Sequence, residues 1–203
     1  MANKVSTDKI IIEPIQTATA SITVGMASKM GYISHRLDPS VVTEFTKRER
    51  GETGRKKLRS LDDEYESCFY YTNDDEYGVP VGAFFKGMLD AATDLSIAKT
   101  QIKRAVRLLG DIVPLRYDKV IRREDLVKRA GINGTPDIRH RPEFMEWECD
   151  IHILYDVNVI TLDTIANLID RAGFTSGIGD WRPSSPKSPG TFGMYAVKLT
   201  IDN

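Results

Sequence analysis

Alternating hydrophobic and polar positions mark the clearest predicted strands of this 203-residue chain. Over residues 147–155 every second side chain is hydrophobic, and the positions between them begin with Glu, Asp and His. Side chains of a strand point alternately to the two faces of a sheet, so this pattern predicts one buried face and one wet, acidic face. The same alternation predicts a last strand over residues 195–201. β-Branched residues predict a long first strand over 10–24, a short strand over 67–72, and a strand or hairpin arm over 111–123.

Hydrophobic residues that recur every three or four positions predict the helices. A first helix is expected over residues 81–95, directly after a proline, and a second over residues 99–109, up to a glycine. A third helix is expected to begin after the N-cap Thr161 and to end at Gly173, because glycine commonly follows the last helical residue. A further short helix is expected over residues 122–130.

The order of these elements predicts the fold class. Strand, insertion, strand, helix pair, strand, strand, helix and strand reduce to β-α-β-β-α-β once the insertions are removed. We therefore expect an α+β protein of the ferredoxin-like type, also called split βαβ or RRM-like, in which helices cover one face of an antiparallel sheet and loops or hairpins are inserted. Residues 1–203 are expected to form a single domain with a flexible basic and acidic insertion at about 25–78. The open sheet face is available to a ligand, although the aromatic RNP1 signature of RNA-recognition domains is absent.

Charge is distributed unevenly along the chain, although the formal net charge is only −1. Any affinity for nucleic acid must therefore come from a local patch. Residues 47–59 are strongly basic, whereas residues 62–76 are rich in acidic residues and contain no basic one. Two interpretations stay open, namely a solvated loop whose halves neutralise each other and a mobile basic finger that contacts phosphate groups.

No catalytic constellation is recognisable in the sequence. Cys68 and Cys149 stand far apart without a CxxC motif or a histidine at ligand spacing, which argues against a zinc site or a disulfide scaffold. Glu146, Glu148 and Asp150 share the polar strand face, but no nearby cluster completes a metal or acid–base site, so a solvated or salt-bridged face is favoured. No nucleophile–base pair or P-loop is present. We therefore expect a protein without enzymatic activity, metal or cofactor.

The sequence shows no membrane signal. No apolar run approaches the roughly 18 residues that are needed to span a bilayer, and the N-terminus lacks the pattern of a signal peptide. We expect a cytoplasmic, soluble protein without a membrane partner, which also agrees with the unpaired cysteines.

A glycine-rich connection follows the last predicted helix. Residues 177–183 read Gly-Ile-Gly-Asp-Trp-Arg-Pro, and close glycines let the backbone approach a phosphate or another chain without a Cβ in the way. Trp181 has two interpretations. Either it stacks on a base, or it fills the core under the loop while Arg182 pairs with Asp180 or with a carboxylate of the sheet.

Three parts of the chain resemble known families. Residues 79–87 read Val-Pro-Val-Gly-Ala-Phe-Phe-Lys-Gly, which is similar to the small-residue start of the first helix in the RAMP superfamily, the ferredoxin-like repeat-associated proteins of CRISPR systems. The helix, glycine-rich loop and last strand over residues 172–195 are similar to the C-terminal glycine loop of that superfamily. Arg139-His140-Arg141-Pro142, Trp147-Glu148 and residues 177–183 together resemble an uncharacterised group of proteins common in bacteriophage genomes.

The resemblance implies a non-catalytic subunit that binds single-stranded DNA or RNA through backbone contacts and assembles side by side along the strand, in the cytoplasm of a bacterial host. Other phage or CRISPR subunits are possible further partners. The loop departs from the superfamily in having only Gly177 and Gly179 before Trp181, and no catalytic histidine can be assigned. The alternative is a protein–protein module, such as a phage assembly factor or an inhibitor that mimics a CRISPR subunit. The residues expected to bind nucleic acid are Lys47, Arg48, Arg50, Arg55, Lys56, Lys57, Arg59, Arg139, Arg141, Gly177, Gly179, Trp181, Arg182 and Lys187.

Overall fold

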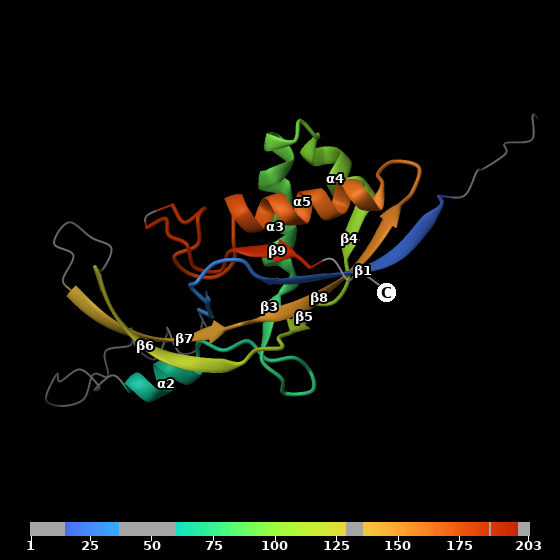
Figure 1. Ribbon diagram of the computed structural model, residues 1–203. Helices are drawn as coiled ribbons and strands as arrows, with labels where there is room; N and C mark the ends of the chain where they lie inside the picture. The colour runs from blue at the N-terminus through green and yellow to red at the C-terminus, as the bar shows by residue number, and fades with distance from the viewer. Residues whose placement is uncertain (1–14, 37–59, 129–135, 187, 199–203) are drawn as a thin grey trace, which may run out of the picture.

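The structure of the protein, a computed structural model, describes residues 15–36, 60–128, 136–186 and 188–198. It is an α+β fold, and every strand pairing among the described residues is antiparallel (Figure 1). The elements are β1 (Thr17–Met26), β2 (Tyr32–Ile33), α2 (Leu61–Glu66), β3 (Gly78–Pro80), α3 (Val81–Asp94), α4 (Lys99–Ala105), β4 (Val106–Leu108), β5 (Ile112–Pro114), β6 (Lys119–Lys128), β7 (Pro136–Met145), β8 (Glu148–Asp156), α5 (Leu162–Thr175) and β9 (Tyr195–Val197).

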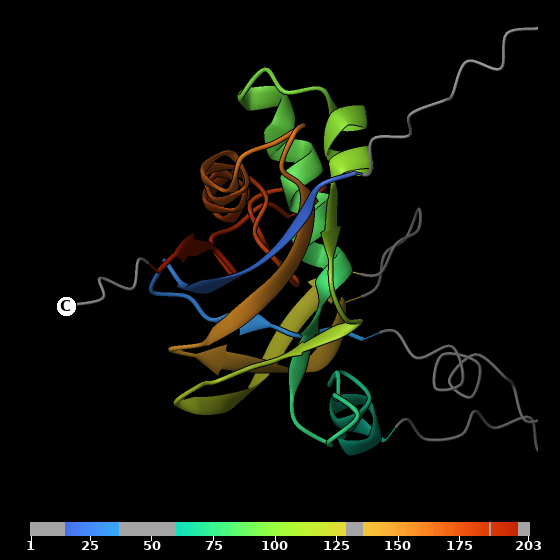
Figure 2. The same ribbon diagram turned by 90° about the vertical axis from the view of Figure 1, so that its right-hand side faces the viewer.

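A four-stranded sheet with the order β4-β8-β1-β9 forms the centre of the molecule. Its two long strands, β1 and β8, pair with each other over nearly their whole lengths. In β8 the side chains of Cys149, Ile151 and Ile153 are fully buried, whereas the residues between them are half-buried or exposed. The predicted strand with one buried and one wet face is therefore confirmed. Helices α3, α4 and α5 lie together on one side of this sheet (Figures 1 and 2).

The N-terminal end of α5 follows its prediction, but the C-terminal end does not. The Thr161 hydroxyl caps the helix by accepting a hydrogen bond from the Thr164 backbone N–H at 3.2 Å. Gly173 does not end the helix, which continues to Thr175. A Cβ at Gly173 would collide with the carbonyl oxygen of Tyr195 in β9, so this glycine allows close packing of helix on strand.

The predicted second helix is shorter than expected. Helix α4 ends at Ala105, and the next three residues form strand β4, which pairs with β8 from Val106 opposite Tyr155 to Leu108 opposite Ile153. The apolar spacing of this segment fits a helix as well as a strand. The exposed backbone edge of β8 decides between them, because pairing satisfies the hydrogen-bonding groups of both strands.

A second sheet with the order β2-β7-β6 lies beyond one end of the four-stranded sheet, where β7 leads into β8 (Figure 1). The short helix predicted over residues 122–130 is wrong, because β6 runs to Lys128 and pairs with β7 along its whole length. Charged residues obscured this strand in the sequence. Several of them pair across the hairpin, which is a tertiary feature that a local pattern does not show.

The strand predicted over residues 67–72 is also wrong. A short helix, α2, precedes this segment and packs on β7, and its N-cap Ser60 accepts a hydrogen bond from the Asp63 backbone N–H. Within 67–72 only an isolated bridge forms, between Tyr71 and Tyr77. Strands β1 and β9 form parts of the first and last predicted strands, but residues 15, 16 and 198 are not in a strand. Residues 10–14 and 199–201 of those predictions lie outside the described residues.

Candidate functional site

A pocket of about 230 Å³ opens between the first turns of α3 and the glycine-rich loop that follows α5. The sequence had singled out residues 79–87 and 177–183 separately, and the fold brings both to this one pocket. The lining residues are Tyr32, His35, Tyr70, Pro80, Ala83, Lys86, Gly177, Ile178, Gly179, Asp180 and Arg182.

The two glycines of the loop are required by its backbone. Gly177 has φ +61° and Gly179 has φ +75°, a region that side chains with a Cβ seldom adopt. A Cβ at Gly179 would also collide with the carbonyl oxygen of Ile33, to which the Asp180 backbone N–H donates a hydrogen bond at 3.1 Å. The close approach that the glycines permit is therefore, in part, an approach to β2 of the same chain.

Two cationic side chains reach the pocket. Lys86 is exposed on α3, and no carboxylate among the described residues lies within 4.0 Å of its ammonium group. Arg182 is half-buried and donates hydrogen bonds to the Gly179 carbonyl at 2.8 Å and to the Ser184 hydroxyl at 3.0 Å. The prediction that Arg182 pairs with a carboxylate is wrong, since its hydrogen-bond partners are a carbonyl and a hydroxyl.

Asp180, the acidic residue of the pocket, is partly neutralised by an arginine of the second sheet. Its Oδ2 atom accepts a hydrogen bond from the Arg141 guanidinium at 2.6 Å. Lys86 and Arg182 carry two positive charges against the one carboxylate of the pocket, so the pocket favours an anion.

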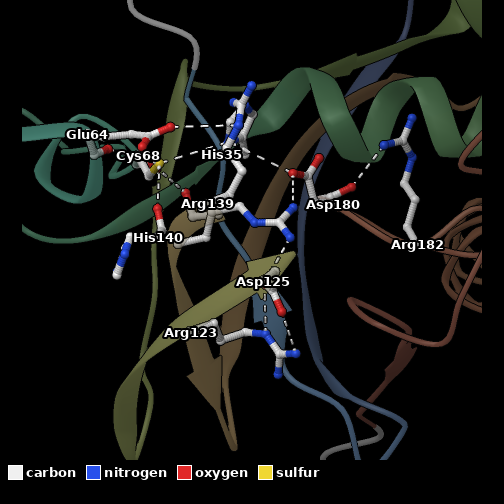
Figure 3. Close-up of polar contacts among 12 residues, drawn as sticks. His35, Glu64, Cys68, Arg123, Asp125, Arg139, His140, Asp180 and Arg182 are labelled. Carbon is white, nitrogen blue, oxygen red and sulfur yellow. Dashed lines mark hydrogen bonds and ion pairs between the residues drawn. The ribbon is translucent and has the colours of Figure 1, made fainter. Parts of the chain in front are cut away.

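His35 lines the pocket, and its Nδ1 atom lies 3.9 Å from both Asp180 Oδ2 and the Cys68 sulfur (Figure 3). Burial lowers the pKa of His35, so the ring is neutral at pH 7. Burial also raises the pKa of the Cys68 thiol to about 11, which keeps it protonated. A protonated, buried thiol is a poor nucleophile. No group of three potential metal ligands is found in the part of the chain that the structure describes.

Behind the loop lies a buried ionic network, which consists of Arg123, Asp125, Arg141, Glu143 and Asp180. Arg141 bridges Asp180 to Asp125, which it reaches at 2.8 Å, and Arg123 bridges Asp125 at 3.0 Å to Glu143 at 2.7 Å. The side chain of Arg141 is only 4% exposed. This arginine, which the sequence predicted to bind nucleic acid, therefore holds the loop against the second sheet.

Trp181 packs under the loop. Its ring faces the Arg141 guanidinium at 4.6 Å and the Phe192 ring at 5.7 Å, and its backbone has φ +53°. This is the arrangement of a side chain that fills the space between the loop and the second sheet.

The remaining predicted site residues lie elsewhere. Arg139 is half-buried on β7, with its Nε atom 3.8 Å from a Glu64 carboxylate oxygen. Lys187 and the whole basic segment 47–59 lie outside the described residues. Lys86 was not among the predicted site residues. It could have been found from its place in the segment 79–87, three residues after Ala83 in the first turns of α3.

Comparison of the chain with protein-family models finds no match, and comparison with curated proteins finds none either. Among the described residues no helix is both long and apolar enough to cross a membrane.

Proposed function

We propose that this protein binds single-stranded nucleic acid through contacts to the sugar-phosphate backbone and catalyses no reaction of its own. The observation that carries the proposal is the pocket in which Lys86 and Arg182 meet the glycine loop. Arginine and lysine are the side chains that bind phosphate. The backbone N–H groups of Gly177, Ile178 and Asp180 already donate to carbonyl groups of the same chain, so the two side chains supply the phosphate contacts. The pocket is smaller than the roughly 300–1,000 Å³ of typical small-molecule sites, so it suits one phosphate group better than a whole nucleotide.

We also propose that the four-stranded sheet is ferredoxin-like. The strands of this sheet follow one another in the chain as β1, β4, β8 and β9. Across the sheet they lie in the order β9, β1, β8, β4, which is the fourth, first, third and second strand of the chain order, and all neighbours are antiparallel. Helices connect the first to the second strand and the third to the fourth. These facts support a split βαβ arrangement with the second sheet, α2 and the β3–β5 ribbon as insertions.

The assembly of the protein is part of the same proposal. The resemblance to the RAMP superfamily and to the bacteriophage group supports side-by-side association along a strand, in a bacterial cytoplasm, with other phage or CRISPR subunits as further partners. The basic segment 47–59 supports additional phosphate contacts beyond the pocket.

The test is binding of labelled oligo-dT and oligo-U to the purified full chain over a salt series. We expect Lys86→Gln and Arg182→Gln each to weaken binding to both oligonucleotides and to make the logarithmic salt dependence shallower by about 0.7 per lost contact. Lys103→Gln is the matched control, because Lys103 is an exposed lysine on α4, which follows the opposite end of α3. No affinity at about 50 mM salt would contradict the function, because phosphate contacts are strongest at low salt. Binding that is unaffected by both pocket variants would place the site elsewhere.

A further inference from the structure

Four tyrosines gather on the side of the molecule where α2 meets the second sheet, three in ring contact with one another and the fourth, Tyr65, joined to them through the buried Phe69. This tyrosine surface consists of Tyr65, Tyr71, Tyr77 and Tyr117. The ring of Tyr77 lies between Tyr71, at 5.4 Å, and Tyr117, at 6.1 Å. Tyr71 is 37% exposed and Tyr117 is 39% exposed, so both rings offer a face or an edge to solvent.

Two buried phenylalanines hold the tyrosine surface in place. Phe69 stacks on Tyr77 at 4.5 Å and meets Tyr65 edge-on at 5.1 Å. Phe144 of β7 packs edge-on against Tyr117 at 5.2 Å. Rings that are already ordered lose little conformational entropy when a ligand binds, which favours recognition by this surface.

The part of the tyrosine surface that residues 60–85 form is acidic. Residues 60–85 contain no lysine or arginine. Five exposed carboxylates of this stretch have no cationic group among the described residues within 4.0 Å. They are those of Asp63, Glu66, Asp74, Asp75 and Glu76. Burial, together with Tyr77 and the charges of Glu66 and Asp75, raises the pKa of Tyr71.

One corner of the surface already binds a guanidinium group. Arg122 of β6 lies over the Tyr65 ring, with its guanidinium carbon 4.8 Å from the ring centroid. The same guanidinium pairs with the Asp62 carboxylate at 2.7 Å. Tyr71 lies near the carboxylates of Glu66 and Asp75. Neither Tyr71 nor Tyr117 has a cation over its ring among the described residues.

We propose that the tyrosine surface docks an extended, arginine-rich segment of a partner protein. Guanidinium groups would lie over Tyr71 and Tyr117, and the one over Tyr71 would pair with the neighbouring carboxylates, as Arg122 does with Tyr65 and Asp62. A nucleic acid does not fit here, because the carboxylates repel phosphate. Tyr70 lines the pocket, whereas the next residue, Tyr71, belongs to the tyrosine surface. The pocket and the tyrosine surface are therefore made of different side chains, and the partner segment and a nucleic acid occupy different sites.

The experiment titrates a fluorescent twelve-residue peptide with four arginines into the full chain, beside the same peptide with citrulline at those positions. Citrulline keeps the shape and loses the charge. We expect the arginine peptide to bind and the citrulline peptide not to bind. Tyr71→Ala and Tyr117→Ala should each weaken binding about two- to fivefold, the range of exposed cation–π contacts, whereas Tyr71→Phe should retain it.

A pair of charge variants tests the contribution of the carboxylates. Asp74→Asn/Asp75→Asn should weaken peptide binding, and asparagine tolerates the positive φ of +58° at position 75. Asp111→Asn/Asp163→Asn removes two exposed carboxylates from other parts of the surface and should leave binding unchanged. Equal loss in both double variants would overturn the proposal, as would equal binding of the citrulline peptide.

Two further outcomes separate the alternatives. If the peptide binds only after the seven basic residues of segment 47–59 are replaced by glutamine, that segment of the same chain covers the surface and the partner proposal is overturned. If an oligonucleotide displaces the peptide and loses affinity in Tyr71→Ala and Tyr117→Ala, the surface binds nucleic acid instead. Lys86→Gln and Arg182→Gln should leave peptide binding unchanged, so this proposal and the proposed nucleic-acid function can fail independently.

Discussion

Asp150 shows how one side chain of the wet strand face is held. Its carboxylate accepts hydrogen bonds from the Arg116 guanidinium and from the Thr23 hydroxyl, each at 2.6 Å. The hydrogen bonds from Arg116 and then from Thr23 lower the pKa of Asp150 to about 2. Strand alternation was enough to place Asp150 on the outer face of the strand, either solvated or salt-bridged. Its partner Arg116, which follows β5, could not be identified before the strands were paired.

The lowered pKa of Asp150 makes part of the stability depend on pH. A carboxyl group with a lowered folded-state pKa contributes stability that is fully present above its ordinary pKa of about 4 and is lost as the pH falls through about 2. We expect Arg116→Gln to lower the free energy of unfolding at pH 5, and the difference from the unmodified protein to shrink between about pH 4 and pH 2. Urea unfolding at several pH values measures this. Asp150→Asn should show a weaker pH dependence over the same range, and a difference that stays constant down to pH 2 would contradict the assignment.

At the scale of elements, the packing of α5 on β9 and α3 decides the role of the glycines. Gly173 lies inside α5 and faces the backbone of Tyr195. A glycine that ends a helix and a glycine that lets a helix approach a strand look the same in sequence, since both interrupt an apolar pattern. Only the position of β9 distinguishes them. Gly82 of α3 differs, because a Cβ built on it would face open space. Apart from its chain neighbours and the backbone of its own helix, no atom of the described residues lies within 4 Å of that Cβ.

These two helical glycines make a matched pair of variants. Gly173→Ala should push α5 away from β9 and lower the free energy of unfolding by about 2–3 kcal/mol. Gly82→Ala fills open space and should raise it by up to about 1 kcal/mol, because alanine is the better helix former. Urea unfolding of both variants provides the measurement. If the two substitutions have equal effects, close packing is not the reason for Gly173.

At the scale of the whole molecule, the ionic network joins parts that are distant in the chain. Arg141 comes from β7, Asp125 from β6, and Asp180 from the loop after α5. The Glu143 carboxylate of the same network accepts a hydrogen bond from the Gly31 backbone N–H at 2.8 Å. The network therefore fixes the glycine loop, and with it the wall of the candidate pocket, against the second sheet.

Removing one member of this network should cost more than replacing two. Arg141→Ala leaves buried carboxylates short of a partner and should lower the free energy of unfolding by about 3 kcal/mol, the low end for a broken buried pair because Arg123 still reaches Asp125. The double variant Arg141→Met/Asp125→Leu removes both charges and should recover part of that loss. Urea unfolding of the single and double variants checks this. A double variant that is less stable than the single one would mean that the net attraction exceeds the cost of burying the charges.

The candidate pocket could be predicted only in parts. Residues 79–87 and 177–183 each carry a local signal, because a proline before an apolar helix and two close glycines both restrict the backbone. About ninety residues separate them in the chain, so their meeting depends on how α3 and α5 pack. The roles of Arg141 and Trp181 could not be read from the sequence, since an arginine and a tryptophan occur both at ligand sites and in buried pairs.

The sequence by itself determined what depends on neighbouring residues. The two-faced pattern of β8, the N-cap of α5 and the apolar stripes of the helices follow from side-chain spacing and local hydrogen bonds. The tertiary structure alone decided strand β4, the β6–β7 hairpin, the partners of each charge, and the meeting of Lys86 with Arg182. These features depend on backbone pairing and on electrostatic contacts between residues far apart in the chain, and such contacts leave no periodic trace in the sequence.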